Sequence, residues 1–289
     1  MLARCLASLF PSPHEVLVVE NASSDGSADM VARMFPRATL LRRQQNLGFA
    51  GAINVAARRA SGRYLLLLNS DAEAGQGSIE ALANFLDSYQ DCGAVAGELQ
   101  DAAGRPQRGW NVRRFPTLST FAVDLLLVGQ MWPGNPVSRR YRADDLDYSR
   151  PIEVDQPAAA CLMVRRAAFD QIGGMDDRFY PAWFEDVDFC RRLRDAGWRI
   201  YFLPEAAFLH HGGVAMRHLG LREFSLAWYR NLERYVRKHH GPAALLLIKA
   251  LVTIGMLERM AVSLATRNRP ALGAYAAVFR QTLTGSRRA

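Results

Sequence analysis

Apolar runs bounded by polar turns predict the elements of the first two hundred residues. Short β-rich runs alternate with stretches whose apolar residues recur every three or four positions, the spacing of one helix face. Strands that alternate with helices are typical of βαβ units and a parallel sheet. The predicted strands are residues 15–21, 38–43, 64–68, 93–99, 158–166, 198–204 and 206–211, and the predicted helices are residues 1–10, 24–35, 46–60, 78–89, 167–174 and 185–197.

Two regions depart from this alternation. Residues 101–155 are rich in Pro, Gly, Arg and Trp, which indicates either a functional lid or binding loop or a poorly ordered insertion. The chain after about residue 215 is predicted to be helical. The sequence is therefore divided into a domain of residues 1–215 and a helical region of residues 216–289.

The charge of the chain is concentrated in its last part. The 289 residues carry a net charge of +8, and from Arg217 onward thirteen Lys or Arg face three Asp or Glu. A basic surface suits anionic partners, but no zinc-ligand spacing or RNA-binding aromatic signature favours nucleic acid. The four cysteines form no C-x-x-C pair, which indicates reduced, structural thiols in the cytoplasm.

Residues 241–265 form the one membrane candidate. Lys249, Glu258 and Arg259 interrupt this stretch, so no uninterrupted run reaches the ~20 apolar residues of a spanning helix. Basic residues flank it on both sides, which favours a helix lying in the interface of an anionic membrane. A helix packed on its own domain is the alternative.

The strand at residues 64–68 ends in a group of oxygen-bearing side chains. Asn69, Asp71 and Glu73 follow its last leucine. Ligands of open parallel sheets bind at the carboxyl ends of strands, and divalent cations that bridge phosphates prefer such oxygens. This motif is either part of a metal–phosphate site or a polar turn.

Two further strand ends carry polar and small residues. Glu20, Asn21 and Asp25 lie beside a Gly-containing turn that opens a helix, and Asn46 and Gly48 begin another. The free N–H groups of a helix start favour anions. Three such strand ends are hard to explain as independent turns.

Acidic residues and a histidine pair add candidate chemistry near the end of this domain. Glu185 and Asp186 fall in the first turn of a helix, where they suit either a general base or a helix cap. Asp188 is expected to pair with Arg191 or Arg192 on the outside of that helix. His210 and His211 end a strand, and one of them could complete a metal site with Asp71.

Taken in order, these stretches resemble family 2 glycosyltransferases, the inverting sugar-nucleotide enzymes of the GT-A fold. The matching pieces are VVENASSDGS, NLGFAGAIN, YLLLLNSDAE, GGMDDRFYPAWFEDVDFCRRLRDAG and AAFLHHGG, between Arg4 and Gly213. The rhamnosyltransferase-like branch, which builds lipid-linked cell-wall or surface polysaccharide, is the most similar. The resemblance implies an α/β fold with a doubly wound, mostly parallel sheet flanked by helices, followed by a C-terminal helical extension.

The resemblance also implies roles for individual residues. Asp71 corresponds to the second acid of the family's D-x-D-type motif, and Asn69 stands in place of the first. Together with His210, or alternatively His211, Asp71 would bind Mg²⁺ or Mn²⁺ on the donor diphosphate. Asp186 corresponds to the catalytic base, with Glu185 as the second choice. The donor nucleotide would contact Glu20, Asn21, Asp25, Asn46, Gly48 and Asn69, and the acceptor side would hold Trp183 and Phe184.

The implied activity is transfer of a sugar, with L-rhamnose as one possibility, from a dTDP- or UDP-sugar to a lipid-linked or glycan hydroxyl. The enzyme would be cytoplasmic and peripheral on the inner face of the cytoplasmic membrane. Two alternative functions compete with this one. One is a non-catalytic binding or scaffold protein on a degenerate GT-A fold, which should have lost one of Asp71, Asp186 and His210. The other is a nucleotidyltransferase, which would show a Gly-rich triphosphate loop near its start.

The start of the sequence differs from the family pattern. Family members begin with an apolar strand that contributes to the nucleotide pocket, whereas MLARCLASLF is predicted to be the helix that follows it. The first strand of the fold is therefore missing from the sequence. We expect the native protein to extend upstream of Met1 by ~10–15 residues, about a strand and a turn.

Overall fold

The computed structural model describes residues 1–10, 13–212 and 219–284, which fall into two compact units. The boundary predicted at residues 215 and 216 lies outside the described residues and stays a prediction. The first unit comprises Met1–Phe115, Arg142–Pro181 and Glu185–Val214, and the second comprises Pro116–Tyr141, Ala182–Phe184 and Ala215–Ala289.

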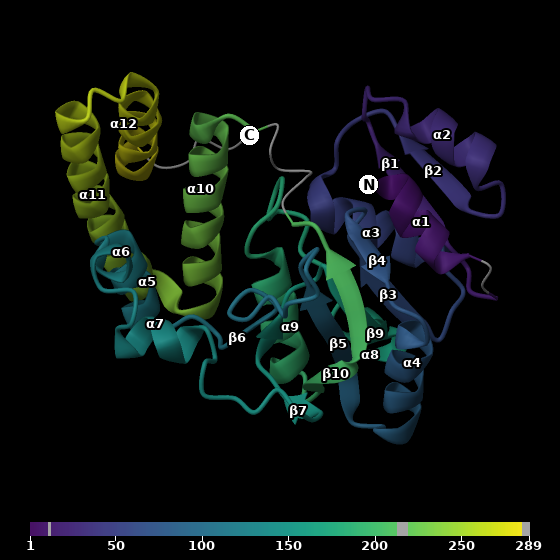
Figure 1. Cartoon of the computed structure of the whole chain (residues 1–289). Coiled ribbons are helices and arrows are strands. Elements are labelled where there is room, and N and C mark those ends of the chain that lie inside the picture. The colour runs from purple at the N-terminus through teal and green to yellow at the C-terminus, as the bar shows by residue number, and fades with distance from the viewer. Residues whose placement is uncertain (11–12, 213–218, 285–289) are drawn as a thin grey trace. The chain divides into compact units, whose positions relative to one another are not determined.

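A mixed sheet forms the centre of the first unit (Figure 1). Its order is β3 (Tyr64–Leu68), β9 (Cys161–Arg165), β5 (Cys92–Gln100), β10 (Arg199–His210) and β4 (Ala72–Ala74), with β7 (Ile152–Glu153) also on β10. Among the described residues, β5 and β10 are the only neighbouring strands of this sheet that pair in parallel. The predicted mostly parallel sheet is therefore wrong. An apolar run such as that of β9 indicates burial on both faces but carries no information on strand direction.

Two smaller sheets complete the first unit. β1 (Leu17–Asn21) and β2 (Thr39–Arg43) form a parallel pair, and β6 (Val112–Arg113) and β8 (Gln156–Pro157) form an antiparallel one. Among the described residues, β1 pairs with β2 alone and β3 with β9 alone. The expected strand upstream of Met1 stays a prediction.

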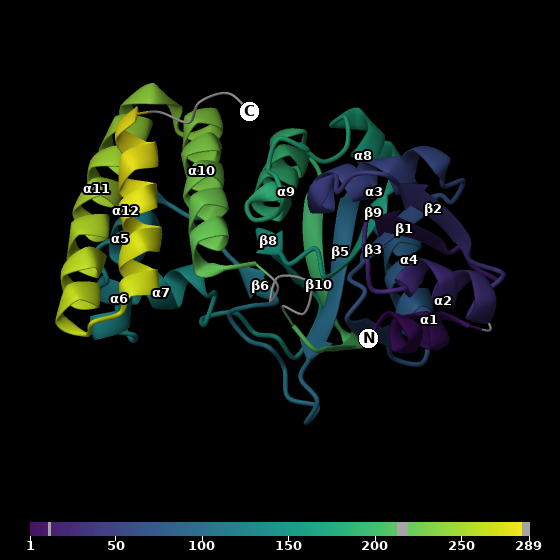
Figure 2. The ribbon, with the colours of Figure 1, turned by 90° about the horizontal axis from the view of Figure 1, so that it is seen from above.

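Helices cover both faces of the mixed sheet (Figure 2). Side chains on β5 alternate between two cores: Ala94 and Ala96 join one, and Val95 and Leu99 join the other. Helices α3 (Gly48–Arg59), α8 (Arg166–Gln171) and α9 (Glu185–Asp195) close the first core, α4 (Ser78–Ser88) closes the second, and α1 (Leu2–Leu9) and α2 (Ser27–Met34) lie near β4 and β2. All four cysteines are buried and free, in agreement with structural thiols.

Strand β10 replaces two predicted strands. Leu203 pairs with Gly97 and Ala207 pairs with the next residue, Glu98, so the residues between Leu203 and Ala207 form a bulge. Pro204 lies in this bulge, where its missing N–H costs no ladder hydrogen bond. The continuation of β10 beyond the bulge pairs with β4, a strand that the sequence did not predict.

The second unit is helical. It contains α5 (Leu118–Leu125), α6 (Val128–Met131), α7 (Pro136–Tyr141), α10 (Leu221–His239), α11 (Gly241–Ala265) and α12 (Arg269–Thr284). The last three helices pack side by side (Figure 2), and α5 packs on α11. Arg259 on α11 donates to the carbonyl of Leu125 at the end of α5, and Gly255 lacks the Cβ that would collide with that carbonyl.

Helix α11 has two apolar faces. One face, which includes Leu245, Ile248, Val252 and Met256, is buried within the unit. The opposite face is exposed and carries Leu246, Leu247, Ile254, Leu257 and Leu264. No helix among the described residues is both long enough and apolar enough to cross a bilayer.

Candidate active site

The turn after β3 places Asp71 beside the end of β10. The amide of Ala72 donates to the carbonyl of Asn69 at 3.0 Å and closes the turn. Ala72 then pairs with His210 in the antiparallel β4–β10 ladder, and the amide of His211 donates to the carbonyl of Asp71 at 3.0 Å. Because of this pairing, Nε2 of His210 lies 3.6 Å from Oδ1 of Asp71, although 139 positions separate the two residues.

His210 is buried and held on one side. Its Nδ1 lies 2.9 Å from Oε1 of Gln107, whose Nε2 donates to the His210 carbonyl at 2.7 Å. Nε2 of His210 is buried and has no hydrogen-bond partner within the described part of the chain. Burial lowers the pKa of His210, and the charge of Asp71 offsets only part of that effect.

Asp71 and His210 fit a divalent cation. A carboxylate oxygen and an unpartnered buried imidazole nitrogen face each other, and both are ligand types for Mg²⁺, Mn²⁺ or related ions. Within the described residues, no group of three or more His, Cys, Asp or Glu is arranged to hold a metal. Asp71 and His210 are therefore the two side chains of these types that the described residues would offer to a cation here.

The neighbouring pair of candidate ligands is engaged differently. Nε2 of His211 lies 2.8 Å from Oε1 of Glu73, and Nε of Arg4 forms an ion pair with the same oxygen at 3.0 Å. Glu73 was predicted to offer a second carboxylate next to Asp71, and it instead bonds His211 and Arg4. Of the two histidines that the sequence left open, His210 is the one that faces Asp71.

Asn21, Asn46 and Gly48 form a hydrogen-bonded cluster at the ends of β1 and β2. Nδ2 of Asn21 donates to Oδ1 of Asn46 at 3.0 Å and to the carbonyl of Gly48 at 3.2 Å. Oδ1 of Asn21 accepts from the amide of Leu47 at 2.7 Å, and Oδ1 of Asn46 accepts from the amide of Gly48 at 2.8 Å. The cluster fixes the start of α3, which the sequence placed at the donor nucleotide.

Gly48 occupies a position where any side chain would be strained. Its φ of +69° lies in the left-handed region, and a Cβ there would approach the carbonyl oxygen of Pro181 to 2.7 Å. That carbonyl accepts from the amide of Phe49 at 2.8 Å. The absence of a side chain therefore permits the segment before α9 to lie against the start of α3.

Of the other three predicted nucleotide residues, Glu20 lies near the end of β1, Asp25 lies in the turn after β1, and Asn69 lies in the turn after β3. Glu20 accepts from the amide of Ser23, and Asp25 accepts from the amide of Ser27 at 3.0 Å. Asn69 is half-buried, and its backbone amide donates to the carbonyl of Ala160 at 3.0 Å. Contact of these three side chains with a nucleotide stays a prediction.

Glu185 and Asp186 begin α9 as predicted. Glu185 is buried with its Oε2 unpartnered among the described residues, and burial, with the adjacent charge of Asp186, raises its pKa well above the usual range. Burial also raises the pKa of Asp186, while Arg113 and the hydrogen bonds it accepts work against that rise. Those bonds come from the Val187 amide at 2.8 Å and from Nε2 of Gln156 at 3.3 Å.

A raised pKa suits a general base, because it lies closer to neutral pH. Asp186 is half-buried, whereas Glu185 is buried. This difference favours Asp186 as the residue that a hydroxyl group can reach. The assignment of the base stays a prediction.

Asp188 corrects one expectation. Its predicted arginine partner is present, with Nε of Arg192 at 2.8 Å, but the carboxylate is fully buried and does not lie on the outside of α9. Arg192 also donates to the carbonyls of Ile172 and Gly174. The pair thus connects α9 to the segment after α8, which helical periodicity alone could not indicate.

Trp183 and Phe184 belong to the second unit. Both have positive φ, 74° and 71°, which is rare for bulky side chains and often marks a functional segment. The Trp183 ring packs edge-on against Phe224 with centroids 4.7 Å apart, and Phe184 packs against Trp228 at 5.4 Å. Their predicted acceptor-side role stays a prediction.

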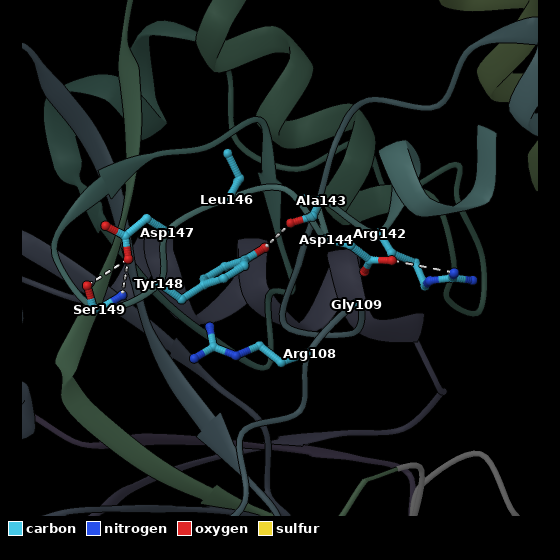
Figure 3. Close-up of a pocket in the computed structure, with 9 residues that line it drawn as sticks. All are labelled: Arg108, Gly109, Arg142, Ala143, Asp144, Leu146, Asp147, Tyr148 and Ser149. Atoms are coloured by element: carbon cyan, nitrogen blue, oxygen red, sulfur yellow. Dashed lines mark hydrogen bonds and ion pairs between the residues drawn. The ribbon is translucent and has the colours of Figure 1, made fainter. Parts of the chain in front are cut away.

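A cavity of about 440 Å³ lies in the first unit apart from these residues (Figure 3). Arg108 stacks over Tyr148 at 4.1 Å, and the Tyr148 hydroxyl donates to the Ala143 carbonyl at 3.1 Å. Arg142 pairs with Asp144 at 3.5 Å. The polar groups of this cavity engage one another, and none of the predicted site residues lines it.

The sequence did not single out Gln107, Gln156 or Arg113. Gln107 and Arg113 lie in the irregular segment 101–155, and Gln156 follows it directly. None of them belongs to a recognisable motif. Gln107 reaches His210 and Gln156 reaches Asp186 only through tertiary packing.

The chain is similar to proteins of known families. The family model described as glycosyl transferase family 2 matches residues 1–173, and one described as N-terminal domain of galactosyltransferase matches residues 143–216. An N-acetylglucosaminyl-diphospho-decaprenol L-rhamnosyltransferase of Mycobacterium tuberculosis is 33% identical over 225 residues, which cover 73% of this chain and 71% of that protein. The rhamnosyltransferase WbbL of Escherichia coli is 26% identical over 154 residues, covering 53% of this chain and 54% of its own.

Solved structures show a similar fold. A mannosyltransferase from Pyrobaculum calidifontis, in complex with GDP-Man and Mn²⁺, aligns with a TM-score of 0.56 and 15% identity over 99% of this chain and 84% of that one. GalNAc-T7 with UDP, GalNAc and Mn²⁺ aligns with a TM-score of 0.54 and 12% identity over 82% of this chain and 45% of that one. The likeness confirms the predicted GT-A-type α/β fold.

Proposed function

This chain belongs to glycosyl transferase family 2, in its rhamnosyltransferase-like branch, and from that premise we propose that it transfers L-rhamnose from a dTDP-sugar to a lipid-linked sugar diphosphate. The names of its relatives support both the sugar and an acceptor of the N-acetylglucosaminyl-diphospho-polyprenol class. UDP remains the second candidate nucleotide. The enzyme acts in cell-wall or surface glycan synthesis.

The juxtaposition of Asp71 and His210 carries this proposal. A scaffold protein on a decayed fold has no requirement to keep an unpartnered imidazole nitrogen buried 3.6 Å from a carboxylate. Asp71 and His210 would hold Mg²⁺ or Mn²⁺, and a bound cation supplies positive charge to the departing diphosphate. Two of the structural neighbours are complexes with Mn²⁺, which supports this assignment.

The remaining steps use the side chains of the first unit. Asn21, Asn46 and Gly48 would hold the nucleoside at the start of α3. The acceptor hydroxyl attacks the anomeric carbon while Asp186 takes its proton, a new C–O bond forms, and the bond to the diphosphate breaks. The nucleoside diphosphate leaves with the electron pair of that bond. A single displacement inverts the anomeric configuration.

A donor screen tests the function. Thermal shifts with dTDP-, UDP- and GDP-sugars, each with Mg²⁺ or Mn²⁺, should show metal-dependent stabilisation by dTDP-rhamnose, about 2.7 kcal/mol at a hundredfold excess over Kd. Asp71→Ala should abolish the metal-dependent part, and the exposed Asp195→Ala should keep it. Equal stabilisation of the Asp71→Ala variant would contradict the metal site. A lack of rhamnosyl transfer to a polyprenyl-diphosphate-linked GlcNAc would contradict the function.

We also propose that the exposed face of α11 lies on an anionic membrane surface. Leu247, Ile254, Leu257 and Leu264 recur on that face at helical spacing, and each is close to half exposed or more. Cations lie at both ends of the helix: Arg237 and Lys238 precede it, and Arg267 and Arg269 follow it. Apolar burial together with basic flanks is the arrangement of interfacial helices.

Vesicle flotation tests this surface. The full chain should bind vesicles containing phosphatidylglycerol and should release as salt rises, because salt screens the basic flanks. Ile254→Asp should weaken vesicle binding. Thr266→Asp, at an exposed position outside this face, should weaken it less. Binding unchanged by Ile254→Asp would exclude this face. Ile254-dependent dimers in sedimentation, with no vesicle binding, would assign the face to a second copy of the chain.

A further inference from the structure

Gln107 makes two hydrogen bonds to one residue. Oε1 lies 2.9 Å from Nδ1 of the His210 ring, and Nε2 donates to the His210 backbone carbonyl at 2.7 Å. The backbone of Gln107 is itself fixed, because its amide donates to the carbonyl of Leu99 at the end of β5. Gln107 therefore grips His210 from a neighbouring segment of the same unit.

The second bond determines which way the amide of Gln107 points. If the amide were turned by 180°, Oε1 would lie at the position 2.7 Å from the His210 carbonyl oxygen, and two acceptors would face each other. The amide nitrogen must therefore face the carbonyl. Oε1 accordingly faces Nδ1, and since Oε1 can only accept, Nδ1 must carry the proton.

The tautomer of His210 follows from this geometry. A neutral imidazole with its proton on Nδ1 presents a bare lone pair at Nε2. That nitrogen is buried and unpartnered in the described part of the chain, and it lies 3.6 Å from Oδ1 of Asp71, beyond hydrogen-bond range. Two electron-rich atoms facing each other in a buried site are stabilised by a cation that binds both.

We propose that Gln107 is the positioning residue that holds His210 in its Nδ1–H tautomer and so leaves Nε2 free to bind the divalent cation together with Asp71. The inference rests on the proposed metal site but concerns a property of the metal-free protein. Partners of this kind orient metal-binding histidines, and their loss typically lowers metal affinity about 10–100-fold. Gln107 acts through His210, with no role in touching the substrate.

Nitrogen-15 NMR of the metal-free protein reads the tautomer directly. Long-range proton–nitrogen correlations of histidine-labelled protein, with the His210 signals assigned by their absence in His210→Ala, should show the proton on Nδ1. Gln107→Met keeps the length of the side chain but removes the acceptor, so the ring should shift toward the Nε2–H form. A wild-type Nε2–H ring, or a tautomer unaffected by Gln107→Met, would overturn the proposal.

Mn²⁺ binding supplies the second readout. Titration of Mn²⁺ in the presence of dTDP, followed by electron paramagnetic resonance, should show about 10–100-fold weaker binding by Gln107→Met. Gln100→Met is the matched control, because the amide of Gln100 bonds Glu98 and not a histidine. The midpoint of thermal unfolding must agree among the variants, so that misfolding is not read as lost affinity. Affinity within twofold of the wild type in Gln107→Met would refute the positioning role.

The two readouts separate this inference from the proposed function. If the tautomer responds to Gln107 but no sugar is transferred, the rhamnosyl assignment fails while the role of Gln107 stands. If transfer occurs and the tautomer does not respond, the role of Gln107 fails alone.

Discussion

Replacement of Asp186 by asparagine removes the proposed base while preserving its surroundings. Oδ1 of the new side chain can still accept from the Val187 amide, now at 2.8 Å. The new amide nitrogen would face Nε2 of Gln156, the donor now 3.3 Å from Oδ2. Gln156 can turn its amide and accept, because its own Oε1 is buried without a partner in the described residues. Asp186→Asn should therefore fold normally.

The expected loss is in the chemical step. General-base catalysis contributes ~10²–10⁴ in rate, which corresponds to about 2.7–5.4 kcal/mol of activation free energy. Steady-state kinetics should show kcat reduced by at least ~10² in Asp186→Asn, and donor affinity measured by titration should change little. Glu185→Gln is the comparison, and it should keep most of the activity. Near-normal turnover by Asp186→Asn, with turnover lost in Glu185→Gln, would transfer the role of base to Glu185.

The pH dependence provides an independent check. Burial raises the pKa of Asp186, so the base is protonated and inactive over a wider acidic range than an ordinary aspartate. The acid limb of the kcat/KM profile should lie above the usual aspartate range and should disappear in Asp186→Asn. An acid limb at the ordinary aspartate pKa would contradict the buried environment.

The remaining predictions concern stability. Burial raises the pKa of Glu185, so ionisation of this carboxyl group lowers the stability of the native protein as pH rises through the raised pKa. Glu185→Gln should therefore raise the free energy of unfolding in urea, and the gain should increase toward higher pH. A gain confined to acid pH would contradict this prediction. Gly48→Ala should lower the unfolding midpoint and the affinity for nucleotide, because the left-handed backbone costs about 1–2 kcal/mol and the Cβ also collides. Gly77→Ala, at φ +75° with open space, should show the backbone cost alone. Asp188→Ala should cost about 3–5 kcal/mol by denaturant titration, against less than ~1 for the exposed Asp195→Ala; equal costs would refute the importance of burial.

The local pattern of apolar and polar residues was sufficient to predict most helices and strands of the first unit. The β3 strand at residues 64–68, α4 from Ser78 and α9 from Glu185 begin where the apolar periodicity and the turn residues indicate. Val187, Cys190 and Leu193 recur at three-residue steps along α9, and all three are buried. Such features depend on near neighbours in the chain, and near neighbours are what a sequence displays.

Strand direction and strand pairing could not be predicted from local sequence pattern. The apolar run of β9 predicts a buried strand, but only its hydrogen bonds to β3 and β5 show that it runs antiparallel to both. The bulge in β10 likewise appears only against its partner, because its extra residues are defined by what Gly97 and Glu98 pair with. These features belong to pairs of segments, and a single segment does not contain them.

The sequence by itself determined the family resemblance, the oxygen-bearing side chains after β3, the acids at the start of α9 and a histidine pair at the end of β10. Tertiary structure decided which histidine faces Asp71, since the β4–β10 register brings His210 to it and leaves His211 with Glu73. It also brought Gln107 to His210 from a segment with no motif at all. The physical reason is that residue type and spacing determine which donor and acceptor groups are present along the chain. Partners more than a hundred positions apart come within hydrogen-bond distance only when the sheet forms.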